Sequence, residues 1–168
     1  KASIFPLHRI TEQQRRIDEK EYPYEFLDIF VGKDGKADVK STKKIPILEF
    51  PVTKTTEDKT GTLVVWERPK ENSNWGTYSA GIDPVSEGKT TTSDSLCSIY
   101  VYKNPVEVTR ENENGELETF VEPDKIVAAW CGRFDDINKT HERLELIIEW
   151  YNAWTIVENN IPQFITHM

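Results

Sequence analysis

A strand–helix–strand pattern near the end of the chain constrains its fold more than any other feature. Residues 134–153 read FDDINKTHERLELIIEWYNA, and their apolar side chains recur at helical spacing. Asp135, Asp136 and Asn138 can cap the start of this helix, and Asn152 can adopt the left-handed conformation that ends one. The apolar runs KIVAAWCGRF and WTIVENN flank the helix. Because a crossover of this length favours parallel pairing, we expect a parallel pair of strands in the sheet.

Two more strands are predicted before this unit. TYSAGID alternates and closes on Asp83, and LCSIYVYKN is rich in β-branched and aromatic residues. The polar run NENGE around Gly115 marks a turn before KIVAAWCGRF. The order strand, strand, strand, helix, strand therefore places the chain in the α/β class, with a mixed sheet and a crossover helix.

Residues 1–70 are expected to form a small β-rich and helical junction segment ahead of this domain. Thr11 caps a run of strong helix formers in ITEQQRRIDEK, and Asp34-Gly35 lies between two apolar runs, as in a hairpin turn. IPILEFPV and GTLVVWERP are short strand candidates. Apolar periodicity lapses in PKENSNWG, so we place the boundary there and expect a second domain over residues 71–168.

Acidic residues are concentrated in the second domain. Residues 1–70 carry 14 Lys+Arg and 12 Asp+Glu, a net charge of +2, whereas residues 71–168 carry 7 and 17, a net charge of −10. Non-specific binding of nucleic acid depends on Lys and Arg that neutralise phosphates. If this domain acts on nucleic acid, it must rely on metal ions or on neighbouring domains. In the alternative, the surplus acids only keep the chain soluble.

The rest of the composition excludes several classes of protein. Nine Pro and eight Gly in 168 residues are too few and too scattered for a disordered or fibrous chain. The longest apolar run, Ile126–Cys131, is too short to cross a bilayer. No basic segment followed by an apolar stretch opens the sequence, so we expect no signal peptide in it. The two cysteines lie inside apolar runs, which fits a reducing compartment such as the cytoplasm. Because the first residue is Lys1, we expect a processed product or part of a longer chain.

Asp83 and Glu158 are the candidate site residues that the pattern itself provides. Each follows a predicted strand, and ligands of open α/β sheets bind beyond the carboxyl ends of parallel strands. If the two strands are parallel neighbours, their carboxylates meet at one edge, where mutual repulsion favours a bound divalent cation or a shared proton. Mg²⁺ suits such ligands, and two ions about 4 Å apart would activate water for an in-line phosphodiester displacement. The alternative is that Asp83 only begins a turn and Glu158 only caps a following helix.

Other possible sites have less support in the sequence. The three histidines show no ligand spacing, and we expect His141 on the exposed face of its helix. Cys97 and Cys131 are expected to fill apolar space on adjacent strands rather than to act as nucleophiles. The run Gly88-Lys89-Thr90 resembles the end of a phosphate-binding loop, but such a loop needs a glycine where this chain has an aspartate.

Four segments, taken in order, resemble the nuclease domain of tailed-phage terminase large subunits: YSAGIDPVSEG with the SDS run after it, AAWCGRFDD before a helix, IVENN, and the preceding strand LVVWERP. The resemblance covers roughly residues 60–168. It implies a ribonuclease H-like fold with two Mg²⁺ or Mn²⁺ ions that cuts concatemeric double-stranded DNA during packaging. The catalytic, metal-binding acids of the first and fourth strands match Asp83 and Glu158. Supporting acids of the first loop match Glu87 and Asp94, so Asp94 is a third metal-ligand candidate.

The same resemblance implies the partners and the place of action. The partners are double-stranded DNA, the portal protein, the terminase small subunit and an ATPase domain of the same polypeptide, in the host cytoplasm and without a membrane. The family's last catalytic aspartate lies after a further helix and strand, so the catalytic set is incomplete in a chain that stops at Met168. The competing hypothesis is a non-catalytic docking module of the same fold that binds the portal or other packaging proteins. A third is another enzyme of this broad fold, such as a resolvase, a transposase-like nuclease or a phosphotransferase.

Overall fold

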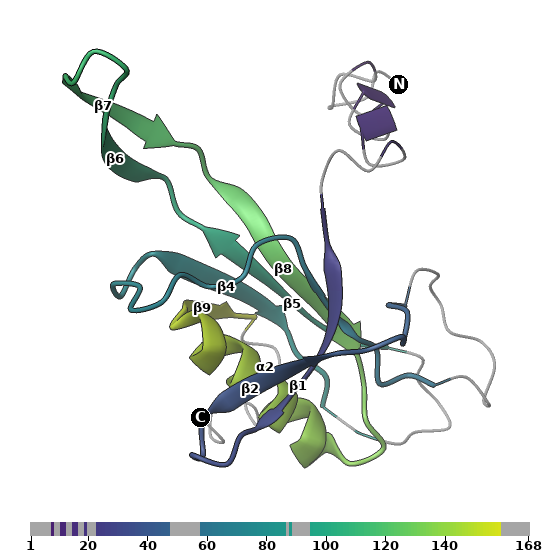
Figure 1. Cartoon of the computed structure of the whole chain (residues 1–168). Coiled ribbons are helices and arrows are strands. Elements are labelled where there is room, and N and C mark those ends of the chain that lie inside the picture. Colours follow the sequence, from purple (N-terminus) through teal and green to yellow (C-terminus); the bar gives the residue numbers. More distant parts are fainter. Residues whose placement is uncertain are drawn as a thin grey trace.

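The sheet of this protein is mixed and has seven strands. The computed structural model describes residues 8, 11–12, 15–16, 19, 23–47, 58–86, 88 and 95–158. The strands lie in the order β2-β1-β3-β8-β5-β4-β9, and β6 and β7 form a separate two-stranded sheet (Figure 1). In chain order the elements are β1 (Glu25–Val31), β2 (Ala37–Ser41), β3 (Leu63–Val65), β4 (Tyr78–Asp83), β5 (Cys97–Lys103), β6 (Val106–Glu111), β7 (Leu117–Glu122), β8 (Lys125–Gly132), α2 (Ile137–Tyr151) and β9 (Trp154–Val157).

The predicted mixed sheet with a crossover helix is confirmed, although the chain is richer in β-structure than expected. β4 and β9 pair in parallel, β4–β5 and β5–β8 pair in antiparallel fashion, and α2 connects β8 to β9. β1, β2 and β3 extend the sheet beyond β8, so strands from both sides of residue 70 share one sheet. The result is a mostly β fold rather than a clear ribonuclease H topology.

The N-terminal elements agree with the sequence where the structure describes them. β1 and β2 form the predicted hairpin, and Gly35 at its turn has a φ of 81°, which glycine adopts without steric cost. Of the predicted helix at Ile10–Lys20, residues 11–12 and 15–16 are helical, and most of the others lie outside the described residues. The first three residues of IPILEFPV form no strand and the remainder lie outside the described part, whereas GTLVVWERP contains β3.

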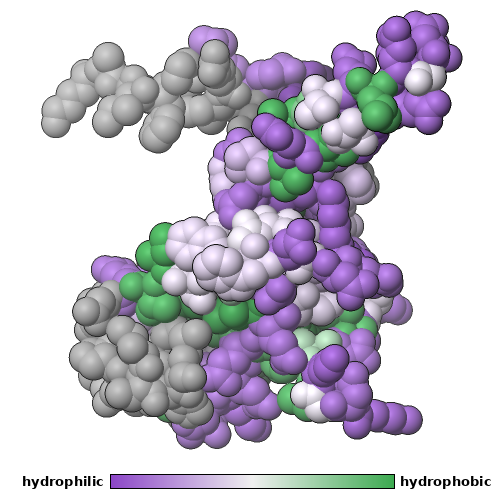
Figure 2. Space-filling model, turned by 90° about the vertical axis from the view of Figure 1, so that its left-hand side faces the viewer, coloured by the Kyte–Doolittle hydropathy of each residue, from purple (hydrophilic) through white to green (hydrophobic). Residues whose placement is uncertain are grey.

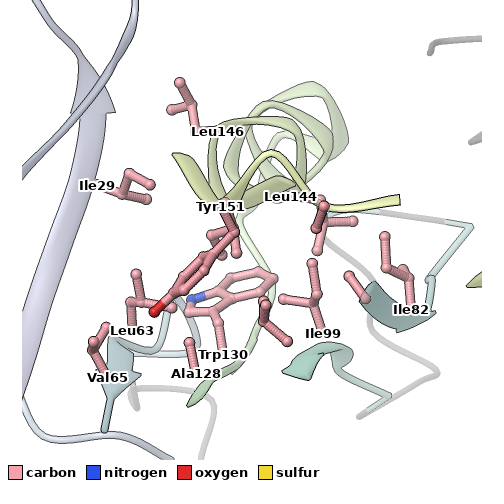
Figure 3. Packing of buried hydrophobic residues seen from close by; sticks show 14 of the residues in the cluster. Ile29, Leu63, Val65, Ile82, Ile99, Ala128, Trp130, Leu144, Leu146 and Tyr151 are labelled. Carbon is pink, nitrogen blue, oxygen red and sulfur yellow. The ribbon is translucent and has the colours of Figure 1, made fainter. Parts of the chain in front are cut away.

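The core lies between α2 and one face of the sheet. The side chain of Trp130, from β8, lies beside that of Tyr151, the last residue of α2 (Figure 3). Trp130 Nε1 donates to the carbonyl of Thr60 at 3.1 Å, and the Tyr151 hydroxyl donates to the carbonyl of Glu67 at 2.7 Å. Because buried polar groups need partners, these two bonds fix how residues 60–67 lie against the core.

Helix α2 begins and ends where the sequence indicates. The Asp136 side chain accepts from the Asn138 amide at 3.0 Å, and Asn152 has the left-handed φ of 49°. The expectation that His141 is exposed was wrong, because only 4% of it is exposed. α2 contacts β1 and β2 as well as β5, so its buried face is wider than the sequence indicated. Among the described residues no helix, α2 included, has the length and apolar character needed to span a membrane.

Strands β6 and β7 form a hairpin that projects from the body, here called the arm and defined as residues 106–122 (Figure 1). The sequence indicated only the turn at Gly115, which has a φ of 81°. The side chains of both strands are exposed or half-buried, so neither strand has the strict apolar alternation of a strand that lies on a core. The two strands of the arm were therefore not predicted from the sequence.

Candidate metal centre

The two strand-end carboxylates lie on neighbouring strands. In the parallel pair of β4 and β9, Ile82 is opposite Val157, and the Glu158 amide donates to the Ile82 carbonyl at 3.1 Å. Asp83 is the next residue of β4, so Asp83 and Glu158 stand at adjacent strand ends. Neighbouring strands are about 4.8 Å apart, a separation that two carboxylates can bridge through a cation.

Both side chains belong to the face of the sheet that points away from the core. Ile82 is buried in the core while Asp83 is exposed, and Val157 packs against the core while Glu158 is exposed. Successive residues of a strand point to opposite faces, so the two carboxylates share the exposed face. The arrangement leaves both carboxylates accessible from solvent.

Asp83 also lies near two cysteine thiols. Cys97 on β5 and Cys131 on β8 belong to adjacent strands, as expected. Burial raises the pKa of the Cys97 thiol to about 12, and Asp83 and Cys131 add to the rise. Burial and then Asp83 also raise the pKa of Cys131. Because a thiol must ionise to attack a substrate, these shifts argue against either cysteine as a nucleophile.

The loop after β4 packs against the start of α2. A Cβ atom at Gly88 would lie 2.2 Å from the carbonyl oxygen of Asp135 and 2.9 Å from the amide nitrogen of Ile137. Only glycine allows this close approach of two backbones. The contact accounts for the glycine of Gly88-Lys89-Thr90 without a bound phosphate. Strand β5 follows the loop, whereas a phosphate-binding loop leads directly into a helix.

Two of the three predicted metal ligands, Asp83 and Glu158, belong to the described residues. Asp94 and Glu87 lie outside the described residues. Within the part of the chain that the structure describes, no three His, Cys, Asp or Glu side chains gather closely enough to hold a metal ion. The carboxylates of Asp83 and Glu158 are hard oxygen donors of the kind that Mg²⁺ and Mn²⁺ accept, so the pair fits a cation that keeps several waters.

A second charged cluster, which the sequence did not reveal, lies at the root of the arm. Lys103 Nζ is 2.7 Å from Glu67 and 3.0 Å from Glu122, and Lys125 Nζ is 2.5 Å from Glu67. Burial lowers the pKa of Lys103, but its hydrogen bonds to the two carboxylates outweigh this effect and raise the pKa above its ordinary value. The sequence indicates this cluster only weakly: along β5 alternate residues face inward, and Lys103 occupies one of these inward-facing positions.

Comparison with known proteins identifies no relative of this chain. No family model, curated protein or solved structure matches the chain. A functional assignment therefore depends on the fold, on the pair formed by Asp83 and Glu158, and on the resemblance of the sequence motifs.

Proposed function

We propose that this chain is the metal-dependent endonuclease module of a phage DNA-packaging terminase, which cuts concatemeric double-stranded DNA by phosphodiester hydrolysis. The observation that carries the proposal is the parallel pairing of β4 with β9, because it brings Asp83 and Glu158 to adjacent strand ends on one exposed face. Exposed carboxylates in this position are accessible to a divalent cation and to a phosphodiester.

The strand order is compatible with a ribonuclease H-like core inside the larger sheet. If β4 is counted as the first strand of the unit, β5 and β8 are the second and third, and β9 is the fourth. Asp83 ends the first strand and Glu158 follows the fourth, which are the two positions that the resemblance assigns to catalytic acids. β1, β2, β3 and the arm would be additions to that core.

The chemistry follows from the two carboxylates and their spacing. Two bound Mg²⁺ or Mn²⁺ ions would supply an activated water and stabilise both oxygens of an in-line displacement. Asp83 and Glu158 would hold these ions from two strands whose separation is set by the β4–β9 hydrogen bonds. Asp94 is the proposed supporting ligand from the loop after β4.

The acidic balance of the chain indicates that other parts of the packaging machine deliver the DNA. Residues 71–168 have a net charge of −10, which disfavours binding to phosphates. In the proposed complex, the ATPase domain of the same polypeptide, the portal protein and the terminase small subunit hold the double-stranded DNA. The nuclease then cuts only what is presented to it in the host cytoplasm.

The test combines metal binding with cleavage. Calorimetry measures Mn²⁺ binding, and nicking of a supercoiled plasmid in Mn²⁺ by a full-length version that supplies the last catalytic aspartate measures activity, for the wild type, Asp83→Asn and Glu158→Gln. We expect each variant to weaken Mn²⁺ binding by about tenfold or more and to abolish nicking while the circular dichroism spectrum stays unchanged. Asp124→Asn, an exposed acid between β7 and β8, is the control and should behave as wild type. Wild-type protein that binds no Mn²⁺, or nicking that survives in both variants, would overturn the proposal.

Two observations favour a second candidate, the docking module without catalysis. The described residues contain no group of three metal ligands, and a projecting arm is a common way to reach a partner protein. This candidate predicts that the chain binds the portal protein equally well in EDTA and in Mg²⁺. It also predicts that Asp83→Asn leaves that binding unchanged, whereas the nuclease proposal predicts metal-dependent effects of the same substitution.

A further inference from the structure

The arm is an exposed and strongly acidic element. Residues 106–122 contain six Glu and one Arg, a net charge of −5. β6 and β7 pair only with each other, and Figures 1 and 2 show the arm standing clear of the body. A two-stranded hairpin without a packing partner is only marginally stable in water, so an arm of this kind gains stability from a partner surface.

The arm carries two exposed apolar side chains, that of Leu117 at its tip and that of Val121 near its root. Leu117 is 78% exposed and Val121 is 59% exposed. The two lie on one face of the arm together with Glu111 and Glu107, which are their partners in the antiparallel register. In Figure 2 hydrophobic and hydrophilic residues alternate along the arm. The Leu117 side chain at the tip is therefore accessible to a partner surface.

The arm is fixed to the body at its root. Glu122, the last residue of β7, accepts hydrogen bonds from Lys103 and Arg110, each at 3.0 Å. Lys103 is buried and also donates to Glu67 at 2.7 Å, which ties the arm to the segment after β3. A fixed arm loses less conformational freedom on binding than a swinging one, which favours its use as a docking element.

A groove with apolar side chains and two charged residues of each sign lies between β1 and α2. Its volume is about 280 Å³. Lys139, Glu142 and Arg143 of α2 line it together with Asp28, which is bound by Arg143 at 2.7 Å. Apart from the ion pair of Arg143 and Asp28, the charged residues that line the groove are Lys139 and Glu142. The apolar side chains of the groove are those of Ile29, Phe30, Val31, Phe134 and Leu146.

The surface next to the groove has the opposite charge to the arm. Residues 31–44, which include the β1–β2 turn, carry five Lys and two Asp, a net charge of +3. Lys40 and Lys44 already pair with Asp28 and Asp58, whereas Lys33 and Lys36 belong to the β1–β2 turn. Figure 1 shows the arm and the β1–β2 turn at opposite ends of the molecule. The arm therefore does not reach the groove of its own chain, and the two surfaces can meet only between molecules.

We propose that the arm of one copy of this chain docks into the groove between β1 and α2 of a second copy. Leu117 enters the apolar part of the groove, and the glutamates of the arm lie against Lys33 and Lys36 of the β1–β2 turn. Each copy uses two different surfaces in this contact, so it is a head-to-tail interaction that can continue into rings or open chains. The proposal goes beyond the nuclease function and does not depend on it.

Sedimentation velocity of the purified chain tests the proposal. Over roughly 10–300 µM, a range suited to a small interface, we expect the average mass to rise with concentration and to fall again in high salt. Leu117→Ser and the double variant Glu113→Lys with Glu116→Lys should each remain monomeric. Trp75→Ser removes a side chain that is 77% exposed elsewhere on the surface, so this matched control should associate as wild type.

Mixing two defective variants distinguishes a second copy from any other occupant. An arm variant, Leu117→Ser, retains its groove, and a groove variant, Val31→Glu with Lys139→Glu, retains its arm. Each should be monomeric alone, and their mixture should form a 1:1 dimer and nothing larger. Wild-type chain that stays monomeric throughout the range would overturn the proposal, as would association that survives Leu117→Ser. A mixture that stays monomeric would also overturn it, and a fold check by circular dichroism on every variant excludes unfolding as the cause.

Discussion

Lys103 and Glu67 form a nearly buried ion pair in which Nζ and the carboxylate are 2.7 Å apart and the lysine side chain is 4% exposed. Glu122 shares the same ammonium at 3.0 Å. Burial alone would raise the pKa of Glu67, but hydrogen bonds from Lys103 and Lys125 lower it. The ammonium therefore joins the arm, β5 and the segment after β3.

Replacement of the buried ammonium should destabilise the fold. Lys103→Met leaves the partly buried carboxylates of Glu67 and Glu122 without their shared cation, so we expect a loss of about 2–4 kcal/mol in the free energy of unfolding. Urea unfolding followed by tryptophan fluorescence measures this loss. Lys125→Met removes a partner of Glu67 that is 53% exposed, and we expect about 1 kcal/mol or less there. Equal losses in the two variants would contradict the assignment.

Acid should remove a contribution to stability made by Asp58. Burial alone would raise the pKa of this carboxyl, but hydrogen bonds from Lys44 and Thr60 lower it from 3.8 to about 2. Because the folded pKa lies below the unfolded one, the stabilisation is fully present above about pH 4 and is lost as the pH falls towards 2. Asp58→Asn should therefore be less stable than wild type at pH 6, and this difference should shrink between pH 4 and pH 2. A difference that stays constant with pH would contradict the pKa shift.

A methyl group at Gly88 should disturb the loop that follows β4. Its Cβ would lie 2.2 Å from the carbonyl oxygen of Asp135, so Gly88→Ala must displace backbone, at a cost of about 1–3 kcal/mol. Thermal unfolding measures the effect. Gly81→Ala is the matched control, because a Cβ there meets no atom within 4 Å and Gly81 has ordinary strand geometry. We expect this control to be neutral or slightly stabilising.

The reactivity of the Cys131 thiol should show whether the Asp83 carboxylate lies close to it. Burial and the Asp83 carboxylate both raise the pKa of Cys131, so removal of that charge increases the thiolate fraction. We expect Asp83→Asn to speed the alkylation of Cys131 several-fold at pH 8, as measured by mass spectrometry of iodoacetamide-treated protein. Asp124→Asn should leave the rate unchanged. If Asp83→Asn also leaves it unchanged, the two side chains are not close enough to interact.

The sequence predicted the part of the fold in which each element has a strong local signal. Helix α2 has caps at both ends and apolar side chains at helical spacing. The acid that ends β4 and the acid that follows β9 were placed at one edge by the parallel pairing rule. The partners of β1 and β3 were not predictable in the same way, because their pairing depends on contacts between residues far apart in sequence. The same reason explains His141, which is buried where the sequence indicated exposure.

The charged cluster and the arm were missed for a different physical reason. Lys103, Glu67 and Glu122 are typical surface residues, and only their meeting in space shows that the lysine is buried. The strands of the arm do not lie on a core, so selection for apolar alternation is weak there. For the candidate metal centre, the two acids followed from strand order, whereas Asp94 lies outside the described residues and stays a prediction.

The arm interrupts a single hairpin, since β5 and β8 stay paired up to Lys103 opposite Lys125. It is an excursion of the connection between these two strands, and its own strands form no hydrogen-bonded ladder with the main sheet. Such an insertion can lengthen, shorten or disappear during evolution while β4 and β9 keep their register. Partner choice and strand-end chemistry can thus diverge independently in descendants of this chain.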